Sequence, residues 1–123
     1  MSSLSKIVYL YSTIKPVYIL KQTPYFTKEL RVLSKKYPSI FEDMELLATK
    51  LMVDPMIGTP LGSDFYKIRM AIKSKGRGKS GGARVIVNIM VVNKVVGLIS
   101  IYDKSEKENI TQSELQEMIR QIR

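Results

Sequence analysis

The chain has 123 residues, 45% of them hydrophobic, and a formal net charge of +9. This length accommodates one compact domain, and the apolar fraction excludes disorder as its main state. The sequence contains neither cysteine nor histidine, which excludes disulfides, thiolate chemistry and the commonest metal ligand and acid–base catalyst. No apolar run approaches the roughly 18–20 residues of a membrane span. We therefore expect a soluble cytoplasmic protein without a metal or another cofactor.

The first half of the chain predicts one short strand followed by two helices. Residues 17–21 are the strand candidate. Apolar residues spaced at i, i+4 and i+7 then predict a helix that starts at Thr23-Pro24. The same spacing predicts a second, antiparallel helix, capped by Ser39 and ending at Asp54. Residues 54–64 are rich in glycine and proline and are predicted to form a loop.

The apolar period changes to two in residues 66–73. Apolar side chains alternate there with Lys67, Arg69 and Lys73, which predicts a strand with one buried and one charged face. The next nine residues, Ser-Lys-Gly-Arg-Gly-Lys-Ser-Gly-Gly, are unsuited to a regular element. We predict that residues 74–82 form a mobile basic loop.

A hairpin and a final helix complete the predicted domain. Residues 83–92 and 95–102 are rich in β-branched residues and are joined at Asn93-Lys94, which predicts an antiparallel hairpin. Residues 111–114, Thr-Gln-Ser-Glu, form a capping box that starts a helix. The order β-α-α-β-β-β-α predicts an α+β domain, with two N-terminal helices packed on a small antiparallel sheet and a C-terminal helix.

The positive charge is concentrated in one third of the sequence. Residues 65–102 contain no Asp or Glu and carry a charge of +8, whereas the rest of the chain carries only +1. The bases of this window are Lys67, Arg69, Lys73, Lys75, Arg77, Lys79, Arg84 and Lys94. Such an excess is typical of a protein that binds a polyanion or an acidic protein.

The alternating strand is the first candidate binding surface. Two residues of extended chain place Lys67 and Arg69 about 7 Å apart on one face, a spacing comparable with that of successive phosphates along a nucleic-acid strand. A solvated sheet face with no ligand is the alternative. That alternative is the weaker one, because ordinary protein surfaces intersperse charges of both signs.

The glycine-rich loop is the second candidate. Gly78-Lys79-Ser80 is similar to the end of a phosphate-binding P-loop, but Lys73 stands where that motif needs another glycine, and a strand follows instead of a helix. ATP or GTP binding is therefore disfavoured. An arm that contacts a phosphate backbone through Lys75 and Arg77 as well as Lys79 is the functional interpretation. A long hairpin connection without a ligand is the equal alternative.

The end of the last strand is the third candidate. Tyr102, Asp103 and Lys104 leave the sheet there and can meet the basic face of the neighbouring strands. Arg84 stands at the start of the central strand, beside the basic loop. A Tyr-Asp pair at a strand end is more often structural, so the alternative is that Asp103 pairs with a nearby base.

Two runs of the sequence resemble a known family. Residues 66–86 and 99–110 together are similar to toxins of the RelE/ParE superfamily, and most similar to its HigB/RelE-like branch. The resemblance covers about residues 17–123, which we predict to be a RelE-like toxin domain. Residues 1–16 precede the usual start of the family and are predicted to be an N-terminal extension.

The resemblance implies the toxin of a type II toxin–antitoxin system, a ribosome-dependent endoribonuclease that cuts mRNA. Its partners would be the ribosome, mRNA and a cognate antitoxin, expected to be a helix-turn-helix protein of the HigA type. The basic site residues of the family would fall on Lys67, Arg69, Arg84 and Lys104, and Tyr102 and Asp103 match positions used by some members. The RNA-binding set would add Lys73, Lys75, Arg77 and Lys79.

The implied chemistry agrees with the composition. The 2′-OH of RNA can attack the adjacent phosphate, so the reaction needs no metal, and Arg and Lys can stabilise the charge that develops. A Lys with a lowered pKa or a Tyr could act as the base. Several members use a His or a Tyr near the final helix, where this chain has Ile110, so the identity of the base stays open.

Two other functions remain as alternatives, because a fold does not determine a function. The first is a ParE-like toxin that inhibits DNA gyrase and has no nuclease activity. The second is a nucleic-acid-binding domain without catalysis, for which the sequence has no recognised reader motif and few aromatics for stacking. The clustered bases favour RNA.

Overall fold

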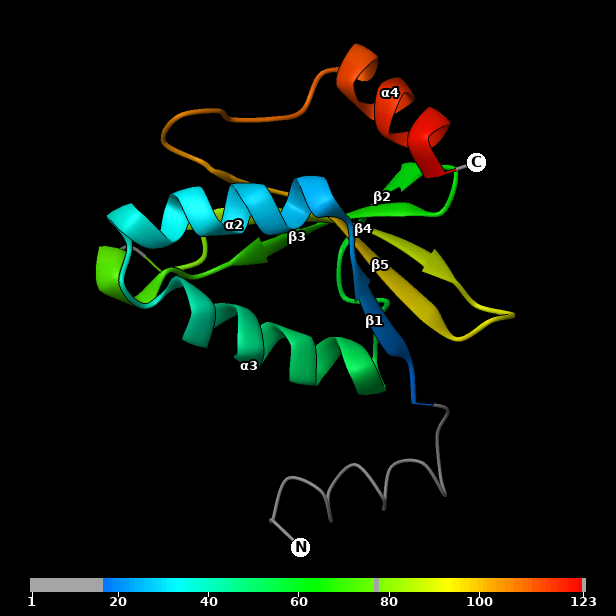
Figure 1. Cartoon of the computed structure of the whole chain (residues 1–123), viewed down its shortest axis with the longest axis horizontal. Helices are drawn as coiled ribbons and strands as arrows, with labels where there is room; N and C mark the ends of the chain where they lie inside the picture. The colour runs from blue at the N-terminus through cyan, green and yellow to red at the C-terminus, as the bar shows by residue number, and fades with distance from the viewer. Residues whose placement is uncertain (1–16, 77, 123) are drawn as a thin grey trace, which may run out of the picture.

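The computed structural model describes residues 17–76 and 78–122, and this part of the chain forms an α+β fold (Figure 1). The elements are β1 (Ile19–Gln22), α2 (Pro24–Lys36), α3 (Ile40–Val53), β2 (Thr59–Gly62), β3 (Phe65–Met70), the 3-10 turn η1 (Lys73–Lys75), β4 (Ala83–Met90), β5 (Val95–Asp103) and α4 (Gln112–Ile122). The predicted fold class is confirmed. The extension predicted at residues 1–16 lies outside the described residues. Among these helices, none is long and apolar enough to cross a bilayer.

The strands form one sheet in the order β1-β5-β4-β3-β2. The predicted hairpin is its centre, with β4 antiparallel to both β5 and β3. The prediction of a small antiparallel sheet is wrong at one edge, because β1 pairs parallel to β5. Both helices of the first half and three strands separate β1 from β5 along the chain, which is the kind of long connection that parallel pairing requires.

The other edge of the sheet also differs from the prediction. Residues 59–62, predicted as part of a loop, form β2 and pair antiparallel with β3. Thr59 lies opposite Lys67, and a register shift follows between Pro60 and Gly62. Proline and glycine disfavour strands, but an edge strand tolerates proline because one side of its backbone needs no ladder partner.

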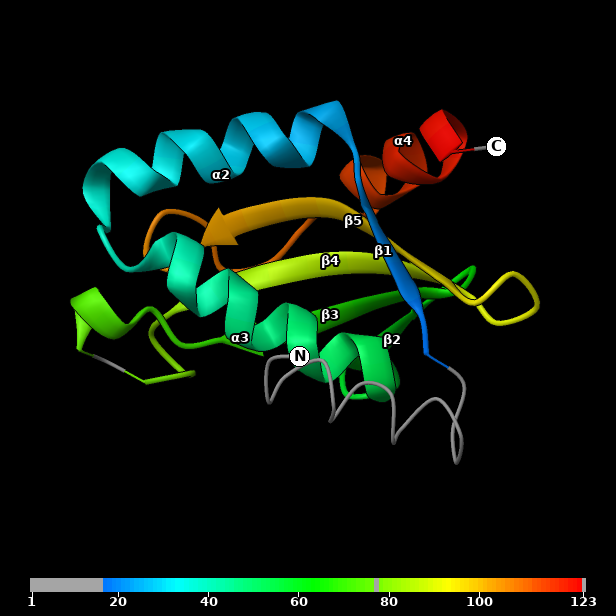
Figure 2. The same ribbon diagram turned by 60° about the horizontal axis from the view of Figure 1, so that its bottom comes forward.

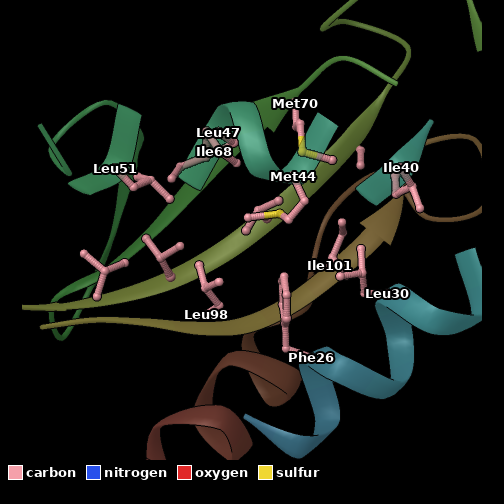
Figure 3. Packing of buried hydrophobic residues seen from close by; sticks show 14 of the residues in the cluster. Phe26, Leu30, Ile40, Met44, Leu47, Leu51, Ile68, Met70, Leu98 and Ile101 are labelled. Carbon is pink, nitrogen blue, oxygen red and sulfur yellow. The ribbon is translucent and has the colours of Figure 1, made fainter. Parts of the chain in front are cut away.

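Two hydrophobic clusters lie on opposite faces of the sheet. Helices α2 and α3 cover one face (Figure 2), and their apolar side chains interlock with those of the strands (Figure 3). That core includes Phe26, Leu30, Ile40, Met44, Leu47, Leu51, Ile68, Met70, Leu98 and Ile101. Helix α4 covers part of the second face, where Leu115, Met118 and Ile119 pack against Phe65 and Ile86. The charged residues of β3 share this second face.

The predicted starts of the first and last helices are confirmed. The Thr23 side chain accepts a hydrogen bond from the Phe26 N–H at 3.0 Å, and proline follows at the first position of the helix. At α4 the Glu114 N–H donates to Thr111 Oγ1 at 3.1 Å, and the Thr111 N–H donates to Glu114 Oε1 at 2.9 Å. Both caps depend only on residues three apart, which explains why the sequence reveals them.

The segment after β3 is drawn towards α3. The strand predicted to run to residue 73 ends at Met70, and Lys73 instead starts the turn η1. The carboxylate of Asp43 accepts hydrogen bonds from the Lys73 N–H at 3.1 Å and from Ser39 Oγ at 2.8 Å. Ser39 therefore occupies the predicted cap position, but its hydroxyl bonds to Asp43 and to the Ser74 N–H instead of the helix backbone.

Candidate functional site

A row of three polar side chains crosses the second face of the sheet. Arg69 of β3 lies opposite Arg84 of β4, which in turn lies opposite Tyr102 of β5. Neighbouring strands are about 4.8 Å apart, so the three residues are immediate neighbours. Lys67 precedes Arg69 by two residues and shares its face. The structure therefore brings four of the six predicted catalytic residues into one cluster.

Arg84 is a buried cation at the centre of this row. The residue is 3% exposed, and its guanidinium donates to the carbonyls of Lys79 at 2.9 Å, Ala83 at 3.1 Å and Ser80 at 3.3 Å. Burial lowers the pKa of Arg84, the charge of Arg69 lowers it further, and Tyr102 opposes them. An arginine still stays protonated at neutral pH. The site thus holds a positive charge where water screens it little.

Tyr102 presents a hydroxyl group without a hydrogen-bond partner. The residue is 7% exposed, and no group in the described part of the chain meets its Oη with hydrogen-bond geometry. Burial raises the pKa of the Tyr102 phenol, while the charge of Arg84 and the backbone amide of Ile110, which lies near the hydroxyl but outside hydrogen-bond geometry, act against that shift. The phenol is therefore protonated and neutral at pH 7. Buried polar atoms without partners are rare in folded proteins.

The segment between β5 and α4 closes over the row. Lys67 Nζ donates to Asn109 Oδ1 at 3.0 Å. Lys107 Nζ lies 5.3 Å from the centroid of the Tyr102 ring and forms an ion pair with Glu114. Two lysines on this face therefore bind oxygen atoms of the protein itself.

Asp103 faces away from the row and is buried. Its carboxylate side chain is 0% exposed and accepts hydrogen bonds from Tyr37 Oη at 2.5 Å, Lys75 Nζ at 2.8 Å and Ser105 Oγ at 2.7 Å. Burial alone would raise the pKa of Asp103, but these hydrogen bonds outweigh it and hold the pKa far below its usual range. The structure therefore confirms the alternative interpretation, in which Asp103 pairs with a nearby base; that base is Lys75. Asp103 positions the turn that carries Lys104.

The residues predicted to bind RNA through the loop differ in their surroundings. Lys73 and Lys79 are exposed. Lys75 is only 11% exposed at its side chain because it pairs with Asp103. Arg77 lies outside the described residues. Lys73 and Lys79 thus remain open to a ligand, whereas Lys75 has a structural partner.

The loop itself is fixed at both ends instead of forming a free arm. At its start, η1 is held by the pair between Lys75 and Asp103. At its end, Arg84 binds two of its carbonyls, and the Lys104 N–H donates to the Gly82 carbonyl at 3.1 Å. A side chain at Gly82 would collide with the carbonyl oxygen of β3, so glycine permits this close approach.

Two hollows lie next to the residues whose carbonyls Arg84 binds. The first, of about 640 Å³, is lined by Lys67 and Arg69 and also by Lys79. The second, of about 430 Å³, is lined by Lys104 and Ser80. Because Arg84 binds the carbonyls of both Lys79 and Ser80, it joins the walls of the two hollows. Lys67 and Arg69 thus line one hollow, and Lys104 lines the other.

The sequence did not indicate three residues of this region, which are Tyr37, Asn109 and Lys107. Tyr37 binds a carboxylate 66 positions away, and Lys67 binds Asn109 over 42 positions, so no local pattern could indicate either contact. Lys107 stands among acidic and polar residues that are typical of a solvated turn. Its place seven residues before Glu114 of the capping box was the one available signal.

The fold and this site define a class of protein: a small α+β domain with a cationic sheet face. The model of the family described as "RelE toxin of RelE / RelB toxin-antitoxin system" matches residues 25–122. This match covers most of the chain, which therefore belongs to the RelE toxin family. The expected family is confirmed.

Solved structures show the same fold. A free E. coli RelE with two arginines mutated to alanine aligns with a TM-score of 0.59 at 21% identity, covering 87% of this chain and 99% of that one. The toxin–antitoxin complex RelBE of E. coli gives 0.53 at 22% identity, covering 70% and 95%. A RelBE-type complex from Mycobacterium tuberculosis gives 0.53 at 15% identity, covering 71% and 98%.

Proposed function

We propose that this chain is a ribosome-dependent mRNA endoribonuclease, the toxin of a type II toxin–antitoxin system. The observation that carries the proposal is the row of Arg69, Arg84 and Tyr102. It combines two cations, one of them buried, with a buried hydroxyl that has no partner in the described protein. Membership of the RelE toxin family supports the same function.

The proposed reaction uses the nucleophile that RNA carries. The 2′-oxygen attacks the adjacent phosphorus and loses its proton to solvent water, and the bond from phosphorus to the 5′-oxygen breaks. The products are a 2′,3′-cyclic phosphate and a 5′-hydroxyl. Arg69 and Arg84 stabilise the additional negative charge of the transition state. Tyr102, whose phenol is protonated at neutral pH, donates a proton to the leaving 5′-oxygen; the charge of Arg84 stabilises the resulting phenolate, which regains a proton from solvent water.

RNA reaches this row by replacing internal contacts. A phosphate oxygen takes the place of Asn109 on Lys67, and a second phosphate takes the place of Glu114 on Lys107. A phosphate oxygen thus replaces the amide oxygen of Asn109 in one exchange and the carboxylate oxygen of Glu114 in the other, so each lysine keeps a hydrogen-bond acceptor. The segment over Tyr102 is then released, and Lys104 contacts the bound strand from the second hollow.

The same proposal includes an antitoxin. Two of the similar solved structures are RelBE toxin–antitoxin complexes. We propose an antitoxin that binds this chain in the cytoplasm and offsets its net charge of +9, and a helix-turn-helix protein of the HigA type fits that role. Its acidic residues would compete with RNA for the cationic face.

The decisive experiment is cleavage mapping in a translation extract. We expect the wild-type protein to cut mRNA within codons and Lys104→Ala to cut roughly 100-fold more slowly, the scale of losing one charge-stabilising group. Lys28→Ala, an exposed lysine of α2, is the matched control and should cut normally. Intact mRNA together with blocked DNA supercoiling would contradict the proposal and favour a gyrase inhibitor.

A further inference from the structure

A basic groove runs between α3 and the outer side of β3, next to the candidate site. It is the hollow of about 640 Å³ that Lys67 and Arg69 line from the sheet. Three further cations belong to other parts of the chain: Lys50 on α3, Lys73 on η1 and Lys79 in the basic loop, and all three are exposed. Five cations from four segments thus surround one groove.

The single carboxylate in the lining does not neutralise these cations. Asp43 is buried, and its Oδ2 already accepts hydrogen bonds from Ser39 and from the Lys73 backbone. Ordinary surfaces intersperse charges of both signs, whereas the charged side chains of this groove that are not buried are all positive. Lys50 lies outside the acid-free window of the sequence, so the fold itself has brought it to the other four.

The shape of the groove is maintained by close backbone packing. A side chain on Gly58 would lie 2.8 Å from the Lys67 carbonyl oxygen and 2.9 Å from the Ile68 side chain. Only glycine lets the chain before β2 approach β3 so closely. The exposed side chains of Leu46 and Ile57 line the groove as well and offer apolar contact to the faces of bases.

We propose that this groove is a second RNA subsite, which holds the strand flanking the phosphate that reacts. The inference rests on the proposed function. The groove is continuous with the candidate site, because Lys67 and Arg69 belong both to that site and to the groove wall, and this continuity supports the proposal. A strand held at Arg69 must continue in some direction, and this groove offers five cations there against one buried carboxylate that already accepts two hydrogen bonds. Lys50 is the specific residue that the structure assigns to the flanking strand.

Binding of uncleavable RNA tests this subsite. The probes are single-stranded RNAs of four and twelve nucleotides with 2′-O-methyl groups, which block the nucleophile, and fluorescence anisotropy gives their affinities across a salt series. Each lost phosphate contact lowers the salt slope by about 0.7, which corresponds to about fivefold weaker binding at 0.1 M salt. We expect Lys50→Ala to show this loss with the twelve-nucleotide RNA and none with the four-nucleotide RNA.

The control variant is Lys28→Ala, which removes the same charge from a helix outside the groove. Equal losses in Lys28→Ala and Lys50→Ala would overturn the subsite, as would a loss that is independent of RNA length. Displacement of the twelve-nucleotide RNA by a polyglutamate peptide that binds more tightly would assign the groove to an acidic protein and also overturn it.

Failure of the subsite is distinguishable from failure of the proposed function. If mRNA is cut on the ribosome but Lys50→Ala binds both RNAs like the wild type, the subsite is wrong and the nuclease stands. If Lys50→Ala shows the length-dependent loss but the protein never cuts mRNA, the subsite stands as an RNA-binding groove and the nuclease is wrong.

Discussion

Replacing Asp103 by asparagine is expected to lower the free energy of unfolding by about 3 kcal/mol, the scale of breaking a buried ion pair. The carboxylate is fully buried, and Lys75, its closest cation, is only 11% exposed. The variant keeps the shape of the side chain but removes the charge, so Lys75 and the hydroxyl of Tyr37 lose their anionic acceptor. Urea denaturation at pH 7 measures the loss.

The pH dependence of this stabilisation has a definite sign. The pKa of Asp103 in the folded protein lies below that of an unfolded aspartate, which is about 3.9. The contribution of Asp103 is therefore fully present above pH 4 and is lost as the pH falls further towards the folded value. The stability difference between wild type and Asp103→Asn should shrink in that acidic range.

Two controls make the Asp103 prediction specific. Glu108→Gln removes an exposed carboxylate from the same connection and should change the stability by less than about 0.5 kcal/mol. Adding Lys75→Met to Asp103→Asn should restore part of the loss, because the unpaired cation is then removed. A loss below 1 kcal/mol for Asp103→Asn at pH 7 would show that the cluster does not anchor the turn.

Replacing Tyr102 by phenylalanine is expected to separate activity from stability. The change removes only the hydroxyl, which is buried without a hydrogen-bond partner in the described protein. Such a group costs about 1–3 kcal/mol in the folded state, so the variant should be as stable as the wild type or more stable. If Tyr102 donates the proton, cleavage on the ribosome should slow by at least about 100-fold.

The control for Tyr102 is Tyr25→Phe, which changes an exposed tyrosine on the first helix. It should leave mRNA cleavage unaltered. Single-turnover cleavage on purified ribosomes measures the rates, and thermal denaturation measures the stabilities. Cleavage by Tyr102→Phe at the wild-type rate would remove Tyr102 from the mechanism, and a large loss of stability would mean that its hydroxyl has a structural role.

The sequence predicts the elements whose signals are local. The caps at Thr23 and at residues 111–114 depend on side chains three positions apart, and the helix and hairpin periods extend over whole elements. The two edges of the sheet were predicted wrongly or missed. Pairing of β1 with β5 joins segments that lie far apart in the chain, which no local pattern records. Strand β2 directly precedes β3, but its proline and glycine disfavour a strand, so the sequence predicts a loop there.

The candidate site shows the same division. Alternation correctly placed Lys67 and Arg69 on one face, and the strand order then put Arg84 and Tyr102 beside them. The burial of Asp103 could not be predicted, because two of its partners lie 66 and 28 positions away. Lys50 joined the basic groove only through the packing of α3 beside β3, which composition does not reveal.

In the proposed reaction the nucleophile comes from the RNA and not from the protein or a bound water. The most direct measurement uses an mRNA with a single 2′-deoxynucleotide at the mapped cleavage position, presented on purified ribosomes. We predict that cleavage at that position is abolished, while the unmodified mRNA yields a 5′-hydroxyl and a 2′,3′-cyclic phosphate. Cutting of the deoxy-substituted mRNA at the same position, or fragments that carry a 5′-phosphate, would contradict this mechanism.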